Sequence, residues 1–269
     1  MNRILAILVV LVCTSVPLAS ALPQQYVTRD CAVFLQLDRI PALIDEVERY
    51  AISFGLGLSR GDLSKKISSG ILGQEGFPGI DLRKPVAMFL LYQGQKMSGG
   101  VFMVPVSDQN LFRTVVLSRL PLGDSPIQYR DGYAIIASSP AVMASFNGGQ
   151  KKPVTLVSEA QLSIYVDMAL FKDEIQKAIQ QYTRYAQGSD ARLMRSAMLF
   201  YADWLKEMRG ASYSLSLNQK GIELGYTMDL VPGGKMAAML AATPAGSPDL
   251  IGAMPADSYV ALGSRMNLK

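Results

Sequence analysis

Two aspartates stand at matching points of the chain, and their type and spacing most suggest chemistry. Asp38 ends the apolar run of residues 33–38, and Asp167 ends the run of residues 162–167. Two carboxylates that face one another can divide general acid and base work between them. An aspartate between a strand and a helix also accepts hydrogen bonds from the free N–H groups of the first helical turn. We interpret both residues as helix caps and keep a carboxylate hydrolase as the alternative.

Histidine is absent from the whole sequence, which removes the usual base of serine and cysteine hydrolases and the commonest metal ligand. The segment Gly57-Leu58-Ser59-Arg60-Gly61 matches the G-x-S-x-G pattern, but that motif needs a preceding strand and a histidine. A helix is predicted before it, so we interpret the segment as a glycine-rich turn that ends this helix. A hydrolase with a Ser-Lys pair is a further alternative, and we assign no catalytic residue.

Metal and cofactor sites lack their usual patterns in this sequence. Without histidine, a zinc or copper site would need several thiolates, and the chain has only two cysteines. No D-x-[DN]-x-[DN]-G calcium loop occurs, and the glycines within residues 55–61 and 73–79 lack the G-x-G-x-x-G and P-loop spacings. The sequence therefore predicts no cofactor and no metal.

Residues 1–21 have the three parts of a secretory signal peptide. Arg3 supplies a positive start, residues 4–12 form an unbroken apolar run, and Ala19-Ser20-Ala21 is a small-residue cleavage site. The apolar run is shorter than the roughly 20 residues that span a bilayer. We predict an exported protein of the bacterial periplasm or cell surface, with no transmembrane span after cleavage. Retention of the signal as an anchor is the alternative.

Cleavage would remove Cys13 and leave Cys31 as a lone thiol within the apolar run of residues 31–35. A single thiol cannot form an internal disulfide, so the fold must depend on its hydrophobic core. Because the neighbours of Cys31 are apolar, we expect this side chain to be buried as a small hydrophobic residue.

Apolar periodicity predicts an α+β fold of antiparallel sheets covered by helices. Each half of the chain contains a strand, a helical region, a hairpin and a further helix, with matching points about 129 residues apart. We therefore predict two related strand-helix-hairpin-helix units, residues 22–150 and 151–254, which meet at a linker near residue 150. Residues 255–269 form either the opening strand of a further unit or the closing strand of the sheet. In the first case, the chain would be a purely structural repeat fragment of a longer secreted protein.

The second hairpin, residues 213–217 and 222–230, alternates apolar residues with serine, asparagine, glutamate and threonine. Such alternation is typical of an antiparallel sheet that buries its apolar face and turns its polar face to water. We therefore expect one face of this hairpin to be solvated.

Five short segments carry a resemblance to a known family. They are Leu35-Gln36-Leu37-Asp38, Tyr165-Val166-Asp167, residues 101–108, residues 131–140 and Pro255-Ala256-Asp257-Ser258. Together they resemble a domain-of-unknown-function family of secreted bacterial proteins with repeated α+β units. The resemblance covers most of the chain after the signal peptide. It implies an exported repeat protein and brings no catalytic residues with it.

The helical region of residues 168–209 carries the candidate binding surface. Five large, adaptable side chains recur near its end: Met194, Met198, Tyr201, Trp204 and Met208. Methionine and aromatic side chains can bind lipids, peptides or partner helices. Packing of the same stripe on the sheet is the competing interpretation. The charges of this region are mixed in sign, which is typical of a solvated face and not of nucleic-acid binding.

These features favour an exported non-catalytic envelope protein that binds an unknown protein partner or an apolar ligand through a helix-covered sheet. The histidine-independent hydrolase and the structural fragment are the alternatives. A binding protein requires a continuous apolar groove or patch. A hydrolase requires Asp38 and Asp167, or a serine and a lysine, to converge in a pocket.

Overall fold

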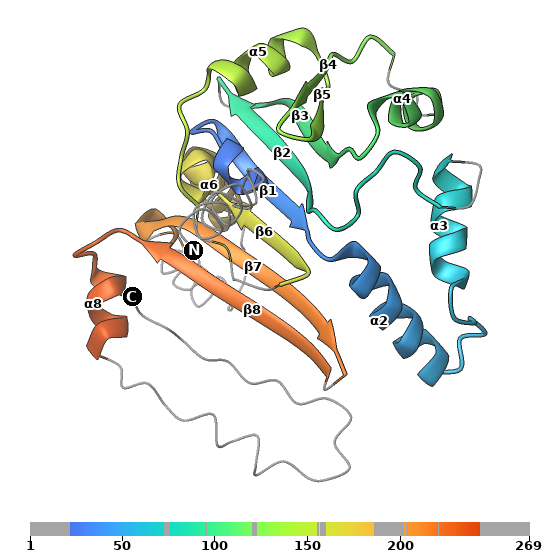
Figure 1. Cartoon of the computed structure of the whole chain (residues 1–269). Coiled ribbons are helices and arrows are strands. Elements are labelled where there is room, and N and C mark those ends of the chain that lie inside the picture. Colours follow the sequence, from blue (N-terminus) through green and yellow to red (C-terminus); the bar gives the residue numbers. More distant parts are fainter. Residues whose placement is uncertain are drawn as a thin grey trace, which may run out of the picture.

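Figure 1 shows the computed structural model of the chain. It describes residues 22–72, 76–94, 96–119, 123–154, 156, 160–185, 202, 204–219 and 221–242. The predicted signal peptide and residues 255–269 lie outside the described residues. Leu22, the first described residue, is also the first residue after the predicted cleavage site.

The first half contains five strands and the helices between them. After the short 3₁₀ helix η1 (Pro23–Tyr26), the order is β1 (Cys31–Leu37), α2 (Ile40–Ser53), α3 (Asp62–Leu72), β2 (Val86–Gln93), β3 (Lys96–Pro105), α4 (Gln109–Leu111), the π-helical turn η2 (Phe112–Leu117), β4 (Ile127–Arg130), β5 (Tyr133–Ala137) and α5 (Pro140–Gly148). Proline in the first turn and the hydroxyl of Ser139, which accepts from the Val142 N–H, determine where α5 begins.

The second half contains β6 (Leu162–Val166), the 3₁₀ helix η3 (Met168–Phe171), α6 (Lys172–Tyr185), β7 (Met208–Asn218), β8 (Gly221–Leu230) and α8 (Lys235–Ala242). Strand β7 begins earlier than the predicted strand at residue 213. Its early residues include Gly210, where a Cβ atom would lie 2.7 Å from the hydroxyl oxygen of Tyr165. A glycine is needed here because the Tyr165 ring lies directly against the β7 backbone.

The fold is α+β, as predicted, and all eight strands join in one antiparallel sheet of order β4-β5-β3-β2-β1-β6-β7-β8. The first strands of the two halves pair with each other at the centre, where Leu35 lies opposite Ile164. On its outer side β1 pairs with the β2–β3 hairpin, and β6 pairs with the β7–β8 hairpin. The strands expected in separate units therefore form a single sheet.

One face of the sheet, called here the core face, carries the main hydrophobic core in its first half. The rings of Phe34, Phe89 and Phe146 follow one another with 5.0 Å between neighbouring centroids. Such aromatic contacts contribute about 0.5–1.5 kcal/mol each beyond the burial of their area. Helix α5 supplies Phe146, and η1 supplies the buried Tyr26.

The chain that follows α5 returns across the core face to reach β6. Lys152 lies beside Asp167 at the end of β6, whereas Gln161, at its start, accepts a hydrogen bond from the Leu217 N–H of β7. Between these two points, Val154 and Leu156 pack against the core. The predicted linker is therefore anchored to the sheet.

Side chains of each half also contact the other half. Arg49 and Tyr50 of α2 donate hydrogen bonds to the Asn218 carbonyl at the end of β7, at 2.7 and 2.9 Å. In the reverse direction, the ring of Tyr92 in β2 lies 5.4 Å from that of Phe171 in η3. Figure 1 shows α2 and α6 at opposite ends of the central strands. The two halves thus stabilise one another.

The central pairing predicts that neither half folds alone. Residues 22–150 and residues 151–269, produced separately, should each lack a cooperative thermal transition, because β1 and β6 would be left as unpaired apolar edges. Co-expression should restore a soluble one-to-one complex, which size-exclusion chromatography and circular dichroism would detect. The substitution Ile164→Asp should prevent this association, because it places a charge opposite Leu35. A cooperatively folded single half would contradict the prediction.

Candidate binding surface

The second face of the sheet, called here the open face, is apolar across all eight strands. Its central row consists of residues that lie opposite one another in successive strands: Ile127, Ile136, Phe102, Met88, Leu35, Ile164, Tyr213 and Tyr226. The flanking rows include Leu90, Val33, Val166, Ala211 and Met228 on one side, and Val86, Leu37, Leu162, Leu215 and Leu224 on the other. In the described part of the chain these rows contain no charged side chain.

The two ends of the open face differ in how far other parts of the chain cover them. At the β4–β5 end, Phe112 and Val116 of η2 pack on Ala134 and Ile136, and all four are buried. Further along, Phe102 and Tyr213 are each 48% exposed, and Leu224 is 69% exposed. Large apolar side chains are thus exposed on the sheet itself, away from the cover that η2 provides.

One face of the second hairpin was expected to be solvated, and the two strands differ in which residues they expose. In β7, Ser212 and Ser214 are buried on the core face, whereas Tyr213 between them is exposed on the open face. Ser214 lies opposite Ser163 of β6, which is also buried. In β8, by contrast, the polar Glu223, Thr227 and Asp229 are exposed. A polar face turned to water is therefore correct for β8 and wrong for β7.

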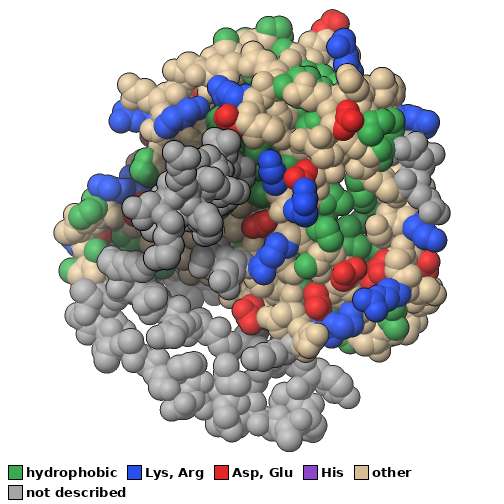
Figure 2. Space-filling model, in the orientation of Figure 1, with side chains coloured by type: hydrophobic (Ala, Val, Ile, Leu, Met, Phe, Trp, Pro, Cys, Tyr) green, Lys and Arg blue, Asp and Glu red, His purple; other side chains and the backbone are tan. Residues whose placement is uncertain are grey.

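Hydrophobic side chains also gather in a hollow between α2, α3 and the segment that leads into β2, as Figure 2 shows. Figure 1 places the end of β1 and the start of β2 beside it. Leu37 and Val86 lie opposite each other at that point of the sheet. The hollow therefore adjoins the open face.

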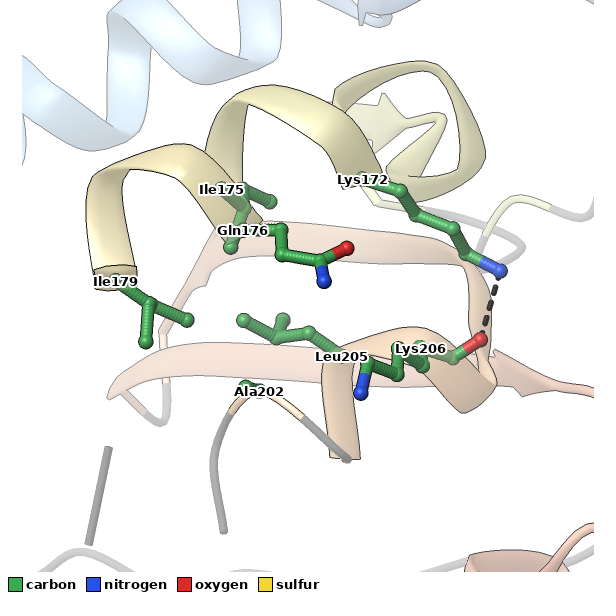
Figure 3. A pocket seen from close by; sticks show the side chains of 7 residues that line it. All are labelled: Lys172, Ile175, Gln176, Ile179, Ala202, Leu205 and Lys206. Carbon is green, nitrogen blue, oxygen red and sulfur yellow. Dashed lines mark hydrogen bonds between the residues drawn. The ribbon is translucent and has the colours of Figure 1, made fainter. Parts of the chain in front are cut away.

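A small pocket lies between α6 and residues 202–206 (Figure 3), within the region where the sequence placed the binding surface. It is lined by Lys172, Ile175, Gln176, Ile179, Ala202, Leu205 and Lys206. The Lys172 ammonium closes one side by donating to the Lys206 carbonyl at 2.7 Å. Its volume of about 20 Å³ is far below the roughly 300–1,000 Å³ of small-molecule sites.

Of the five residues predicted to form the binding surface, two have described positions. Trp204 is half-buried just before β7, and Met208 is 2% exposed as the first residue of β7. Met194, Met198 and Tyr201 lie outside the described residues. Sequence reasoning did not single out the exposed residues Phe102, Tyr213, Leu224 and Tyr226. For the last three, the signal was the alternation within β7 and β8, which marks one apolar side but not whether it is covered. Phe102 lies in a continuous apolar run, which does not indicate an exposed side.

Asp38 and Asp167 do not converge. Each follows the end of its own strand, and the two strands are antiparallel, with Leu37 opposite Leu162 and Val33 opposite Val166. At 3.3–3.4 Å per residue the two carboxylates therefore stand at opposite ends of the ladder, roughly 17 Å or more apart. They cannot share acid–base work on one substrate.

The two aspartates also differ in their local roles. Asp167 accepts a hydrogen bond from the Ala169 N–H at 3.0 Å, so it is the expected cap of η3, and it forms an ion pair with Lys152. Burial is the largest single influence and disfavours the charged form of Lys152, but the hydrogen bonds and charges of Asp167 and Tyr165 together outweigh it and raise the pKa of the lysine. Asp38 accepts only from the adjacent Arg39 N–H, and Arg39 is the N-cap of α2. Capping by Asp38 was therefore wrong.

The Gly57–Gly61 segment is a turn between α2 and α3, as predicted. Gly57 and Gly61 have φ angles of 67° and 87°, which favour glycine. The carboxylate of Glu48 in α2 accepts from the N–H groups of Gly61 and Leu63 at 2.7 and 2.6 Å, and these bonds lower its pKa. Ser59 is part of the same turn and its N–H donates to Asp62. The segment therefore joins two helices.

Cys31 is fully buried, as expected, and its thiol donates to the Val33 carbonyl at 3.3 Å. Burial, followed by the negative charge of Asp30, raises the pKa of the thiol to about 12. Because the thiolate is the reactive form, this side chain is chemically inert in the native protein.

Among the described residues, no three histidine, cysteine, aspartate or glutamate side chains gather where they could hold a metal ion. In the same part of the chain, none of the helices has the length and hydropathy needed to cross a bilayer. Comparison with known proteins adds no relative: no family model, no curated protein and no solved structure matches this chain.

The ion pair predicts unequal effects of the same substitution at the two aspartates. Asp167→Asn should lower the free energy of unfolding by about 3 kcal/mol, because it leaves the partly buried Lys152 without its counter-charge. Asp38→Asn, the matched control, should change it by less than about 0.5 kcal/mol. Urea denaturation at pH 7 measures both. Adding Lys152→Met to Asp167→Asn should recover part of the loss, and equal effects at the two aspartates would refute the assignment.

The buried thiol predicts a loss of stability in alkaline solution. Above pH 9 the thiol ionises in the unfolded chain but stays protonated in the native protein, so ionisation favours unfolding. Between pH 9 and 10 the wild type should lose about 1 kcal/mol more than Cys31→Ala, which has no thiol to ionise. Urea denaturation at pH 8, 9 and 10 tests this, and parallel pH profiles of the two proteins would contradict it.

Proposed function

We propose that the mature chain is an exported, non-catalytic envelope protein that binds a protein partner through the open face. One observation carries the proposal: an uncharged row crosses the whole sheet and remains exposed at Phe102, Tyr213 and Tyr226. In β7 the serines on either side of Tyr213 are buried on the core face while the tyrosine is exposed. The exposure therefore follows from which face of the sheet the rest of the chain covers. Protein interfaces are enriched in such aromatic and methionine side chains.

The shape of the surface favours a protein partner over a small apolar ligand. Apolar side chains are spread across a sheet face and the adjoining hollow, whereas the pocket beside α6 has a volume of only about 20 Å³. Small ligands need an enclosed cavity that buries most of their area. An amphipathic helix can instead bind an open apolar surface through its own apolar side.

Export rests on the pattern of residues 1–21, with its positive start, apolar run and small-residue cleavage site. The beginning of the described fold supports it. Pro23, Tyr26 and Val27, which follow the predicted cleavage site, are buried. Cleavage after Ala21 would leave all of these contacts in place.

We infer in addition that residues 22–150 and 151–254 are related units. The register of the central ladder supports this, because Leu35 and Ile164, which lie opposite each other, are separated by the same interval as Asp38 and Asp167. The order of strand, helices, hairpin and helix is also the same on either side of this ladder. Duplication of one unit accounts for both features.

Native mass spectrometry of residues 22–269, purified from its own exported fraction, tests the binding proposal. We expect a bound polypeptide that is released from the double variant Phe102→Ser/Leu224→Ser, with at least tenfold weaker binding, because two exposed anchors of the open face are lost. A bound lipid that the same variant loses would instead identify an apolar ligand. An unliganded wild-type protein would refute both forms of the proposal.

The variant Leu111→Ser is the matched control. Leu111 is 46% exposed, like Phe102, but it belongs to α4 and not to the sheet. Its binding should equal that of the wild type. Thermal unfolding of all variants checks that the fold is intact, and equal loss of binding in the control would show that general hydrophobicity, not the open face, holds the partner.

A further inference from the structure

The two sides of the sheet differ at their third strands. Counted outward from the central ladder, β3 is the third strand of the first half and β8 that of the second. β3 has neighbours on both sides, β2 and β5. Among the described residues, β8 has a partner on one side only, which is β7. A ten-residue strand with a bare edge invites pairing with another strand.

The chain after β8 contains a counterpart of the strand that covers β3. Asp131-Gly132-Tyr133 leads into β5, and Asp257-Ser258-Tyr259 occurs after β8 with an apolar run behind it. Each run ends at a serine, Ser138 in the first half and Ser264 in the second. Tyr133 and Tyr259 also follow β3 and β8 at nearly the same interval along the chain.

Helices α4 and α8 strengthen the match, because they stand at corresponding places. α4 with η2 follows β3, and α8 follows β8 after a similar short connection. Phe102 of β3 and Tyr226 of β8 occupy corresponding positions in the two halves. Counted along the chain from these two residues, Phe112 of η2 corresponds to Met236 of α8. Phe112 packs on the open-face side of β5. An apolar residue in α8 is therefore placed to cover a strand added beside β8.

We propose that residues 257–262 form this strand and pair antiparallel with the free edge of β8. The register of β3 with β5 gives the register that we expect between β8 and the added strand. In the first half, Phe102 lies opposite Ile136 and Val104 opposite Ala134. By correspondence, Leu262 lies opposite Tyr226 and Val260 opposite Met228. The proposal rests on the relation between the two units and is independent of what binds the open face.

This placement gives each side chain of the segment a suitable environment. Val260 and Leu262 extend the apolar rows of the open face, as Ala134 and Ile136 do in the first half. Tyr259 and Ala261 point to the core face, like the buried Tyr133 and Ile135. The added strand also shields Tyr226, which is 43% exposed. Pairing thus satisfies the outward backbone groups of β8, and the segment of residues 257–262 that becomes the edge is shorter than the ten-residue β8.

Disulfide trapping in residues 22–269 tests the register. In a Cys31→Ala background, the pairs Tyr226→Cys/Leu262→Cys and Met228→Cys/Val260→Cys should oxidise to intramolecular disulfides. Directly opposed antiparallel residues have Cα atoms about 4.5–5.5 Å apart, within the range that a disulfide spans. The control Tyr226→Cys/Ala261→Cys is shifted by one residue, so its side chains point to opposite faces. It should react at least tenfold more slowly.

Non-reducing electrophoresis and intact mass distinguish the outcomes. Equal rates for the matched and shifted pairs, or no disulfide in either matched pair, would overturn the proposed strand. Disulfides between two molecules would show that a second copy covers β8. Hydrogen exchange of the unmodified protein is the second measurement: the alternate amides of residues 257–262 that bond to β8 should exchange at least a hundredfold more slowly than an unstructured chain, and a segment without any protected amide would overturn the proposal. Neither readout depends on partner binding.

Discussion

The antiparallel pairing of β1 with β6 is the interaction on which the rest of the structure depends. It joins the first strands of the two halves, from Val33 opposite Val166 to Leu37 opposite Leu162, and each strand then pairs with its own hairpin. The ladder also brings the helices after each strand against the other half, as the bonds from α2 to Asn218 show. Because antiparallel strands end on opposite sides, it also separates Asp38 from Asp167 and so removes the geometry that a carboxylate hydrolase would need.

The same ladder gives the molecule two unequal faces. On the core face, aromatic residues fill the first half, and Ser163, Ser212 and Ser214 are buried in the second. The apolar side chains of the second half consequently lie on the open face. Full burial of a large apolar side chain contributes about 1.5–3 kcal/mol, so residues such as Leu224 forgo much of that stabilisation in the isolated chain. A partner that covers the open face would recover it, which is the physical basis of the proposed binding.

Asp38 and Asp167, which follow the two central strands, have different roles. Asp167 caps η3 and is held by Lys152, because the chain after α5 passes over that end of the sheet. Among the described residues, the Asp38 carboxylate at the other end accepts its hydrogen bond from the adjacent Arg39 N–H. A similar asymmetry separates β3, which β5 covers, from β8. The proposed strand at residues 257–262 would remove this second asymmetry.

Local patterns in the sequence determined the fold class and most of the elements, because alternation and helical spacing depend only on near neighbours. Ser139 and Pro140 were enough to begin α5, and Gly55, with a φ angle of 70° directly after the C-cap Phe54, was enough to end α2. The short strand β4 was missed because its four residues, Ile127–Arg130, are largely polar. Only the tertiary structure decided that β1 pairs with β6 and that the cover of β7 lies over its serines. Alternation shows that a strand has an apolar side, but contacts between residues far apart in the chain decide whether that side is buried.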